Sequence, residues 1–458
     1  MNIITKKTGT SERPTGNITA SYGEANSQEY NATMAGKAGA ARYFLALGSQ
    51  SSDGFLHNRY YDRENFFGKF SVDLPSSTVL TLSSGYSEPE IRFFDSSGWG
   101  VGTEGHDRNF WSNMTLDTRL TDIINFNASI FRYEQKYIRD SYLYPTKTTY
   151  SYEVNDNTNT GFSSQLTGRF DSNLVVLGGE FERSNNGFND TNRNYDETWA
   201  LYLNDTFTLG PVTVTPGLRY DHLSLTDDIV SHSLGITWQA VDHTLFRFLA
   251  AEGFRKPYMY YIENAESGLE PEKIASYQVG FETTVLPAFR LKGTFFEHRL
   301  KNVWAGEWIF SDDWKYNYYN ADKSKRYGYE LELTTIPWHY VSAQASFTYV
   351  YTDYYGEQDN DDSYSGKLTL LYDNPHLFTA ELFGHYMWWN EDRAAADNPA
   401  DYGTMIWDLS LTKPLQLCEH SSVDIFFTAH NLFDGRDYWI DVYDNAHRWI
   451  EGGLRFHF

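Results

Sequence analysis

An alternation of apolar and polar residues recurs along the whole chain and constrains its fold more than any other feature. In one segment Trp199, Leu201 and Leu203 share one face, and polar residues such as Asn204 share the other. A period of two residues is that of a β-strand whose two faces meet different surroundings. The pattern recurs, for example, at residues 212–221, 276–282 and 327–334.

The connections between these segments favour a barrel over a soluble sandwich. We count about 22 candidate strands, with short connections after the even-numbered ones, at residues 37–39, 75–76, 171–173, 210–211, 286–287 and 373–375. Connections after many odd-numbered strands are long, at residues 51–62, 88–106, 135–159, 253–272, 301–324 and 389–402. Bacterial outer-membrane barrels have short turns at one end and long loops at the other. A soluble protein of two sheets has no reason to keep that order.

The composition agrees with strands that face lipid on one side. Aromatic residues make up 17% of the chain, yet hydrophobic residues total only 41% and the mean hydropathy is −0.55. A transmembrane barrel needs this mixture, because its outer face is apolar with aromatic girdles while its lumen and loops are polar. No stretch approaches the roughly 18 consecutive apolar residues of a membrane-spanning helix. A sheet that spans lipid must close, so that no edge is left unpaired.

We therefore predict an all-β fold: a transmembrane antiparallel β-barrel of about 22 strands, with short periplasmic turns and long extracellular loops. Porins with open channels have about 16–18 strands, whereas 22 strands mark transporters with a wide, plugged lumen. The period of two also predicts that five side chains face the lumen and contact a plug. They are Arg219, Asp221, Glu282, Glu330 and Glu332.

The residues also argue against several functions. The net charge of −24 disfavours nucleic-acid binding, because phosphate repels such a surface. Cys418 is the single cysteine, so no intrachain disulfide can form. No nucleophile–base pair, metal-ligand spacing or phosphate loop stands out, so we expect no catalysis, metal site or cofactor. Residues 1–7 lack the apolar core of a signal peptide, so we expect a truncated or processed chain.

Five segments resemble parts of the TonB-dependent receptors, a family of outer-membrane importers, and occur in that family's order. Residues 2–9 are similar to the last plug strand, 200–221 to a mid-barrel hairpin, 253–257 with 269–273 to a loop motif, and 431–434 and 453–458 to the C-terminal signature. The resemblance covers nearly the full chain. It implies that residues 1–10 are a remnant of the last plug-domain strand and that residues 11–458 are the receptor barrel.

The resemblance also implies partners and a location. A receptor of this family lies in the outer membrane of a Gram-negative bacterium, contacts its lipid and binds a metal chelate. If full-length, it works with a plug domain and with the TonB–ExbB–ExbD complex. The terminal Phe458 resembles the signal read by the barrel-assembly machinery. Most of the plug is missing from this sequence, which we interpret as truncation rather than as a natural plugless pore.

Ligand contacts are expected on the long loops and the upper lumen, because these face the outside medium. Our candidate ligand-binding residues are Arg92, Tyr258, Tyr260, Tyr261, Trp304, Trp308, Trp314, Tyr316 and Tyr318. Their rings could stack on a flat ligand such as a catecholate siderophore, a corrin or a porphyrin. They could equally belong to the aromatic girdle or stiffen the loops.

Other loop residues leave alternatives open. Arg139 and Lys147 could contact an anionic ferric complex or neutralise acidic neighbours. The run at 357–362 could bind Ca²⁺ through oxygen ligands, although a solvated loop tip explains it as well. Haem is disfavoured: haem importers of the family place a His between the two parts of the loop motif, and residues 258–268 contain none. His57 and His106 lie in other outer loops and could serve instead, although an isolated surface His is usually solvated.

The function we predict is active import of a scarce nutrient chelate, a ferric siderophore first. Cobalamin or haem import by the same family, and a passive porin-like channel, are the alternatives. Residues 2–9 speak against the porin, because they resemble part of a plug. A surface adhesin or enzyme would show a smaller barrel or a catalytic constellation, and the sequence shows neither.

Overall fold

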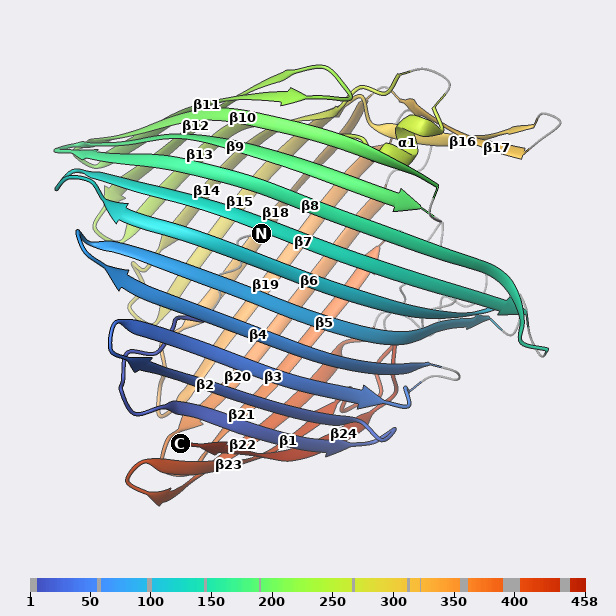
Figure 1. Ribbon diagram of the computed structural model, residues 1–458. Coiled ribbons are helices and arrows are strands. Elements are labelled where there is room, and N and C mark those ends of the chain that lie inside the picture. The colour runs from blue at the N-terminus through green and yellow to red at the C-terminus, as the bar shows by residue number, and fades with distance from the viewer. Residues whose placement is uncertain are drawn as a thin grey trace.

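Within the described residues, 22 antiparallel strands form one sheet that closes on itself (Figure 1). Each strand pairs with its neighbours in the chain, and β1 also pairs with β24, from Asn17 opposite His457 to Gly23 opposite Glu451. Closure leaves no unpaired edge, as a sheet in lipid requires. The predicted fold class and strand number are confirmed.

The computed structural model describes residues 6–55, 59–96, 101–143, 146–188, 191–265, 268–310, 314–321, 323–354, 361–389, 404–436 and 445–458. The first half of the barrel consists of β1 (Thr15–Gly23), β2 (Gln28–Ala38), β3 (Ala41–Ser52), β4 (Tyr60–Leu74), β5 (Thr78–Ser96), β6 (Val101–Arg119), β7 (Ile124–Leu143), β8 (Thr148–Phe170), β9 (Asn173–Phe188), β10 (Thr191–Leu209) and β11 (Val212–Leu223).

The second half consists of β12 (Ile229–Val241), β13 (Thr244–Arg255), β14 (Glu272–Thr283), β15 (Phe289–Lys301), β18 (Lys323–Thr335), β19 (Val341–Tyr354), β20 (Asp361–Asn374), β21 (Phe378–Trp389), β22 (Ile406–Cys418), β23 (Ser421–His430) and β24 (Trp449–His457). Three further elements lie in its loops: helix α1 (Met259–Glu263), and β16 (Trp304–Phe310) and β17 (Trp314–Asn320), which pair as a separate hairpin.

Strands β5 to β8 are longer than predicted. The prediction of long loops at 88–106 and 135–159 is therefore wrong. These strands have 19, 19, 20 and 23 residues, whereas about 9–11 residues span a membrane. The polar residues that suggested loops pair across strands instead: Arg92 Nη2 lies 2.7 Å from Glu104 Oε1. Cross-strand ion pairs support a sheet in water, so the strands continue past the apolar belt.

The predicted alternation of connections holds at one end of the barrel. At this end the turns between paired strands have two to five residues. Examples are residues 39–40 after β2 and 210–211 after β10. The long connections lie mainly in the second half, where 253–272 contains α1 and 301–324 contains the hairpin. The connection expected at 389–402 falls almost entirely outside the described residues.

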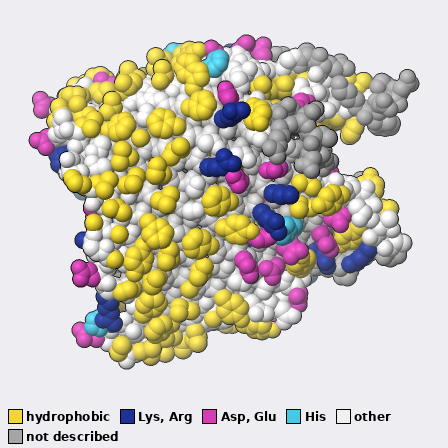
Figure 2. All heavy atoms as spheres, in the orientation of Figure 1, with side chains coloured by type: hydrophobic (Ala, Val, Ile, Leu, Met, Phe, Trp, Pro, Cys, Tyr) yellow, Lys and Arg dark blue, Asp and Glu magenta, His cyan; other side chains and the backbone are white. Residues whose placement is uncertain are grey.

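The two faces of the wall differ in chemistry. Leu201, Leu203 and Leu218 are 46–57% exposed, and Figure 2 shows hydrophobic side chains spread over the outer face of the barrel. Arg219 alternates with Leu218 and Tyr220 on β11, so it lies on the opposite face, which borders the lumen. No helix among the described residues has the length and apolarity to cross a membrane.

Residues 6–14, which precede β1, form no strand and lie against the wall. The N–H of Gly9 donates to the carbonyl of Tyr43 at 3.0 Å, and the N–H of Lys37 donates to the carbonyl of Ser11 at 2.7 Å. A Cβ on Gly9 would lie 2.2 Å from the backbone nitrogen of Gly36, so a side chain does not fit there. The assignment of residues 1–10 to a plug stays a prediction, and residues 1–5 lie outside the described residues.

Candidate functional site

Two loops at one end of the barrel join into a single structure. They are the β13–β14 loop, which carries α1, and the β15–β18 loop, which carries the β16–β17 hairpin (Figure 1). The N–H of Tyr318 in β17 donates to the carbonyl of Asn264 after α1 at 3.1 Å. We call the rings they bring together the aromatic platform: Tyr258, Tyr260, Tyr261, Trp304, Trp308, Tyr316 and Tyr318.

The platform rings contact one another across the two loops. Tyr261 stacks on Tyr318 with centroids 4.1 Å apart and meets Trp304 edge-on at 5.8 Å. Tyr260 meets Tyr318 edge-on at 6.0 Å, and Tyr258 meets Trp304 at 6.3 Å. Within the hairpin, Tyr316 lies 5.0 Å from Tyr318 and 4.9 Å from Trp308. The structure therefore groups seven of the eight predicted aromatic residues.

The rings divide into a packed set and an open set. Tyr261, Trp304, Tyr316 and Tyr318 are half-buried, and burial, followed by the charges of neighbouring tyrosines, raises the pKa of Tyr318. Tyr258, Tyr260 and Trp308 are 61%, 55% and 56% exposed. The packed rings hold the loops together, which leaves the exposed rings as the surface on which a ligand can stack.

A buried carboxylate fastens the hairpin to the barrel. Glu272, at the start of β14, is 9% exposed, and its Oε1 accepts the backbone N–H of Trp304 at 2.8 Å. Its other oxygen lies 3.0 Å from Arg255 Nε, and the Arg255 guanidinium lies 4.2 Å from the centre of the Trp304 ring. One acidic residue thus fixes both the backbone and the ring of Trp304.

Amide side chains make a second attachment at Glu270. Asn320 Oδ1 accepts the N–H of Glu270 at 2.7 Å, and its Nδ2 donates to the carbonyls of Glu270 and Asn302 at 3.0 and 2.8 Å. Asn302 Nδ2 donates to a Glu270 carboxylate oxygen at 2.6 Å. Pro271, between the two acidic residues, is fully buried. The loop motif at 269–273 therefore positions the platform.

The loop motif at 269–273 resembles the family's, but nothing in the sequence gives its residues individual roles. Glu270, Glu272, Asn302 and Asn320 are polar residues in polar loops, so their period and composition give no signal. Only a likeness of the whole motif could have pointed to Glu270 and Glu272, and Asn302 and Asn320 lie outside that motif. The neighbouring Lys256 is likewise structural: its Nζ pairs with Asp196 of β10, which is 8% exposed.

The remaining predicted ligand residues lie elsewhere or are not described. Trp314 opens β17, but its side chain lies outside the described residues. Arg92 lies on β5, on the face of Tyr86 and Glu88, where it pairs with Glu104 and covers the Tyr60 ring at 4.9 Å. It is not part of the platform.

The other loop candidates are scattered. Arg139 lies on β7, with its Nε donating to the Tyr137 hydroxyl at 3.1 Å, and Lys147 lies 5.7 Å from the Tyr142 ring. His106, on β6 rather than in a loop, lies 3.0 Å from Glu88. His57 and residues 357–360 lie outside the described residues, and Asp362 accepts the Tyr349 hydroxyl at 2.7 Å.

The residues predicted to face the lumen lie on the face opposite the exposed apolar rows. Arg219 Nη2 lies 2.9 Å from both Asp221 and Glu180. Glu282 pairs with Arg247 at 2.6 Å and with Arg290, and Glu332 pairs with Lys292 at 3.1 Å. Glu330 lies opposite Thr294 and Thr348. The wall is thus a charged, mutually paired surface, and contact with a plug stays a proposal.

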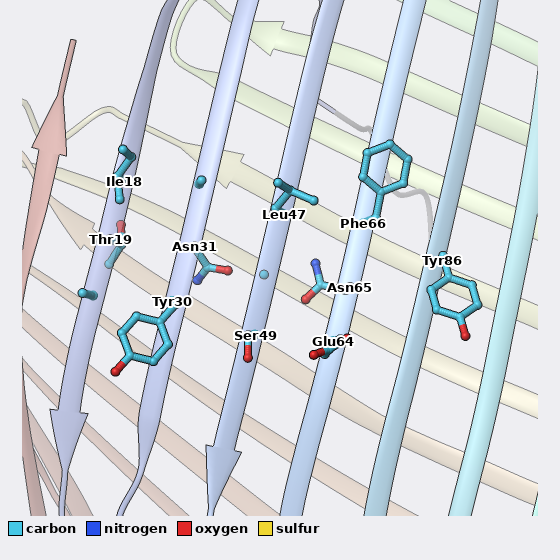
Figure 3. A pocket seen from close by; sticks show the side chains of 13 residues that line it. Ile18, Thr19, Tyr30, Asn31, Leu47, Ser49, Glu64, Asn65, Phe66 and Tyr86 are labelled. Carbon is cyan, nitrogen blue, oxygen red and sulfur yellow. The ribbon is translucent and has the colours of Figure 1, made fainter.

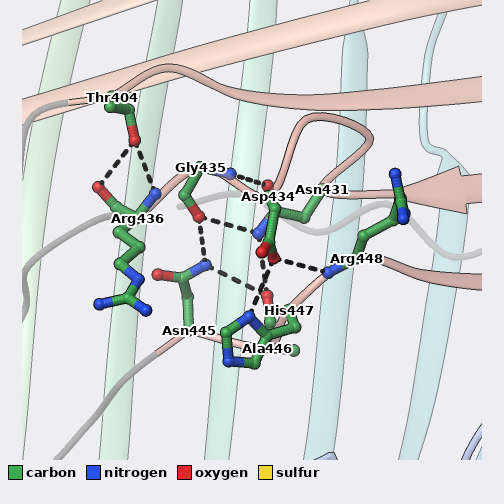
Figure 4. Close-up of polar contacts among 9 residues, drawn as sticks. All are labelled: Thr404, Asn431, Asp434, Gly435, Arg436, Asn445, Ala446, His447 and Arg448. Carbon is green, nitrogen blue, oxygen red and sulfur yellow. Dashed lines mark hydrogen bonds and ion pairs between the residues drawn. The ribbon is translucent and has the colours of Figure 1, made fainter.

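The connection from β23 to β24 is organised by one buried amide (Figure 4). Asn431 is 4% exposed and has φ of 47°. Its Nδ2 donates to the carbonyls of Gly435 and Ala446 at 2.9 and 3.0 Å, and its Oδ1 accepts the N–H of Gly435 at 2.7 Å. Asp408 of β22 accepts its backbone N–H at 2.8 Å. Asn431 therefore joins the start and the end of this loop.

Acidification should loosen the same loop. His447 Nδ1 lies 2.9 Å from Asp434 Oδ1, and this hydrogen bond, followed by that from the Arg448 N–H, lowers the pKa of Asp434 below its ordinary 3.8. The contact therefore stabilises the loop above that pH, and its contribution is lost as the pH falls through the lowered pKa. We expect cleavage between β23 and β24 by an acid-active protease to rise below about pH 4. Asp434→Asn should remove this rise relative to cuts elsewhere; an unchanged pH profile in the variant would contradict the assignment.

Comparisons with known proteins agree with this architecture. The family model described as "TonB dependent receptor-like, beta-barrel" matches residues 15–432. The siderophore receptor PirA from Pseudomonas aeruginosa is similar with a TM-score of 0.77 at 16% identity, over 99% of this chain and 81% of that one. The FrpB iron transporter (F5-1 variant) from Neisseria meningitidis has a TM-score of 0.81 at 13% identity, over 98% and 83%.

The copper transporter OprC is also similar, with a TM-score of 0.79 at 12% identity over 99% of this chain and 81% of that one. At such identities the likeness to solved structures shows the fold alone. The search of curated protein sequences finds no match.

Proposed function

Because this chain belongs to the TonB-dependent receptor family, a family of transporters and receptors rather than enzymes, we propose that it imports a scarce nutrient chelate across the outer membrane of a Gram-negative bacterium. The proposed ligand is a ferric siderophore. The observation that carries this proposal is the aromatic platform: its exposed rings Tyr258, Tyr260 and Trp308 belong to two joined loops. These loops lie at one end of the barrel (Figure 1), and a barrel of 22 strands has a wide lumen.

The chemistry of the platform supports a chelate rather than a bare metal ion. OprC transports copper on the same fold, so the fold does not choose between ligands. Copper and other soft ions prefer Cys, Met and His ligands, and residues 256–271 and 302–322 contain no Cys or His and a single Met, Met259. Tyr258, Tyr260 and Trp308 offer flat faces for the rings of a catecholate chelate. PirA is itself a siderophore receptor.

The barrel wall supplies the second part of the proposal. We propose that Arg219, Asp221, Glu282, Glu330 and Glu332 contact a plug domain, which the TonB–ExbB–ExbD complex moves after the ligand has bound. Three of them already form ion pairs across strands: Arg219 with Glu180, Glu282 with Arg247, and Glu332 with Lys292. Charged plug residues could replace one partner in such an ion pair. The free-energy cost would be small, because an exposed ion pair contributes only about 0–1 kcal/mol.

The proposal is tested by removing the exposed rings. The variant Tyr258→Ala/Tyr260→Ala/Trp308→Ala should bind a ferric catecholate at least about tenfold more weakly than the unaltered protein, since each ring interaction contributes about 0.5–1.5 kcal/mol. Binding is measured by calorimetric titration with ferric catecholate, ferric hydroxamate, cyanocobalamin and haemin.

The matched control removes three rings outside the platform: Tyr150, Tyr152 and Trp338, which are 67%, 57% and 75% exposed. It should bind the ferric catecholate normally. Equal losses in both variants would refute the platform as the binding surface. If only cyanocobalamin or only haemin bound tightly, that compound, and not a ferric siderophore, would be the ligand of this protein.

A further inference from the structure

Polar, uncharged residues form a continuous row across the inner face of β1 to β9. On the outer face Ile18, Leu47 and Phe66 are 54%, 57% and 41% exposed, and the residue next to each of them in the chain lies on the opposite face, which borders the lumen. Strand register places these inner residues side by side. We call them the amide row: Thr19, Asn31, Gly48, Asn65, Ser87, Asn109, Gln135, Asn157 and Asn186.

Gly48 lets two amides of the row approach each other. A Cβ there would lie 2.6 Å from Oδ1 of both Asn31 and Asn65, so a side chain would push the amides apart. Figure 3 shows these two amides reaching toward each other across β3. Farther along the row, Asn157 Nδ2 donates to Gln135 Oε1 at 3.4 Å. An amide has two N–H donors and a carbonyl acceptor, so the row presents both kinds of group to the lumen.

Two charged residues on the loop side of the amide row hold its side chains in place. Arg63 Nε donates to Ser87 Oγ at 3.1 Å, and Gln135 Nε2 donates to Asp107 Oδ2 at 3.1 Å. Both hydrogen bonds link neighbouring strands. A side chain that is already held loses less conformational entropy when a ligand binds to it, so the row is arranged in advance for recognition.

An aromatic strip adjoins the amide row on its short-turn side. Phe67, Trp111 and Tyr133 occupy the next inner positions of β4, β6 and β7. The Phe67 and Trp111 rings stack with centroids 5.5 Å apart, and the indole covers Gly85, where a Cβ would lie 2.4 Å from Trp111 Nε1. The Tyr133 hydroxyl donates to Asn109 Oδ1 at 2.7 Å. The rings and the amides therefore form one joined surface.

The combination of rings and amides suits a neutral ligand rich in hydroxyl groups. The C–H groups of a sugar ring pack on the electron-rich face of an aromatic ring, and sugar hydroxyls donate and accept hydrogen bonds, as amides do. The amide row carries no charge, whereas Arg219 and Glu282, farther round the wall, form ion pairs. Neighbouring strands lie about 4.8 Å apart. This spacing is close to the length of one sugar unit, so amides on successive strands match successive units of a chain.

We propose that the inner wall from β2 to β8 binds a neutral, linear oligosaccharide. Its sugar rings pack on Phe67 and Trp111, and its hydroxyls form hydrogen bonds with the amides of Asn65, Asn109 and Asn157. This site is separate from the aromatic platform, which lies in the loops between β13 and β18. Loss of one site therefore leaves the other intact.

The test titrates the purified chain with maltohexaose and with xylohexaose in a calorimeter, in a zwitterionic detergent that has no sugar head group. At least one of the two should bind, and Phe67→Ala/Trp111→Ala should weaken its binding at least about fivefold. The matched control is Phe66→Ala/Phe110→Ala, which removes two rings of the same strands from the outer face, where they are 41% and 39% exposed. It should bind the sugar normally.

A second variant and two further ligands complete the test. Asn65→Asp/Asn157→Asp keeps the shape of both side chains but removes their N–H donors, so the barrel should fold and sugar binding should again fall at least about fivefold. The anionic hexagalacturonate should bind the unaltered protein more weakly than the neutral sugar. Ferric catecholate should bind all variants equally. No binding of either neutral sugar, equal loss in the outer-face control, unchanged binding by the Asp variant, or tighter binding of hexagalacturonate would each overturn the proposal. Weaker ferric catecholate binding by Phe67→Ala/Trp111→Ala alone would assign this wall to the chelate and overturn it as well.

Discussion

Replacement of Glu272 by alanine should detach the β16–β17 hairpin from the barrel and weaken ligand binding at least about tenfold. The change leaves the backbone N–H of Trp304 without its acceptor and frees Arg255 from the Trp304 ring. A buried donor left unsatisfied costs about 1–3 kcal/mol. The Arg255 pair adds little, because its side chain is 57% exposed and screened by water.

Hydrogen exchange and ligand titration measure the two consequences separately. In the Glu272→Ala variant, backbone amides of residues 304–320 should exchange faster, and ferric catecholate should bind more weakly. Glu307→Ala is the control, since it removes an exposed carboxylate from the same hairpin and should change neither. Faster exchange with unchanged binding would show that the hairpin does not position the ligand.

Replacement of Asn431 by alanine should lower the stability of the barrel's closing hairpin by about 3 kcal/mol, the largest single-residue effect on stability that we expect. The change removes three side-chain hydrogen bonds from a buried position and places alanine at a φ of 47°. The loss is measured as a lower temperature at which the folded barrel converts to the unfolded form in a detergent gel.

Two variants separate the hydrogen bonds from the backbone conformation. Asn431→Gly tolerates the positive φ but loses the hydrogen bonds, so it should recover only part of the loss. Asn26→Ala places alanine at a similar φ of 50° and removes only exposed hydrogen bonds, with Tyr22 and Asp53. It should therefore cost little more than the positive φ itself, about 1 kcal/mol. Full recovery by glycine would show that conformational strain, rather than the amide network, explains the role of Asn431.

Most of the fold could be predicted because lipid imposes a simple pattern. Where one face of a strand meets lipid and the other meets polar groups, the period of two appears in the sequence, as at Leu201 and Leu203. The pattern fails beyond the apolar belt, where both faces of a strand meet water. The residues from Glu88 to Arg92 read as a loop for that reason, although ion pairs such as Arg92–Glu104 hold them in β5 and β6.

The aromatic content of the candidate site could also be predicted, but its organisation could not. Loop position alone identified Tyr258, Tyr261 and Trp304, yet it could not show that the first is exposed while the others pack. That distinction depends on contacts between two loops far apart in the chain, such as Tyr261 on Tyr318. For Arg92 the loop position itself was wrong. It was predicted to lie in a ligand-binding loop, but it lies on strand β5 of the barrel wall.

Hydrogen exchange of the protein with and without a ferric catecholate tests the central claim most directly. If the aromatic platform is the capture surface, the ligand should slow exchange at residues 258–264 and 304–320. The exchange rates of strands β7 and β8, which carry no platform residue, should stay unchanged. Slower exchange confined to other loops, or no binding of any ferric chelate, would contradict the account.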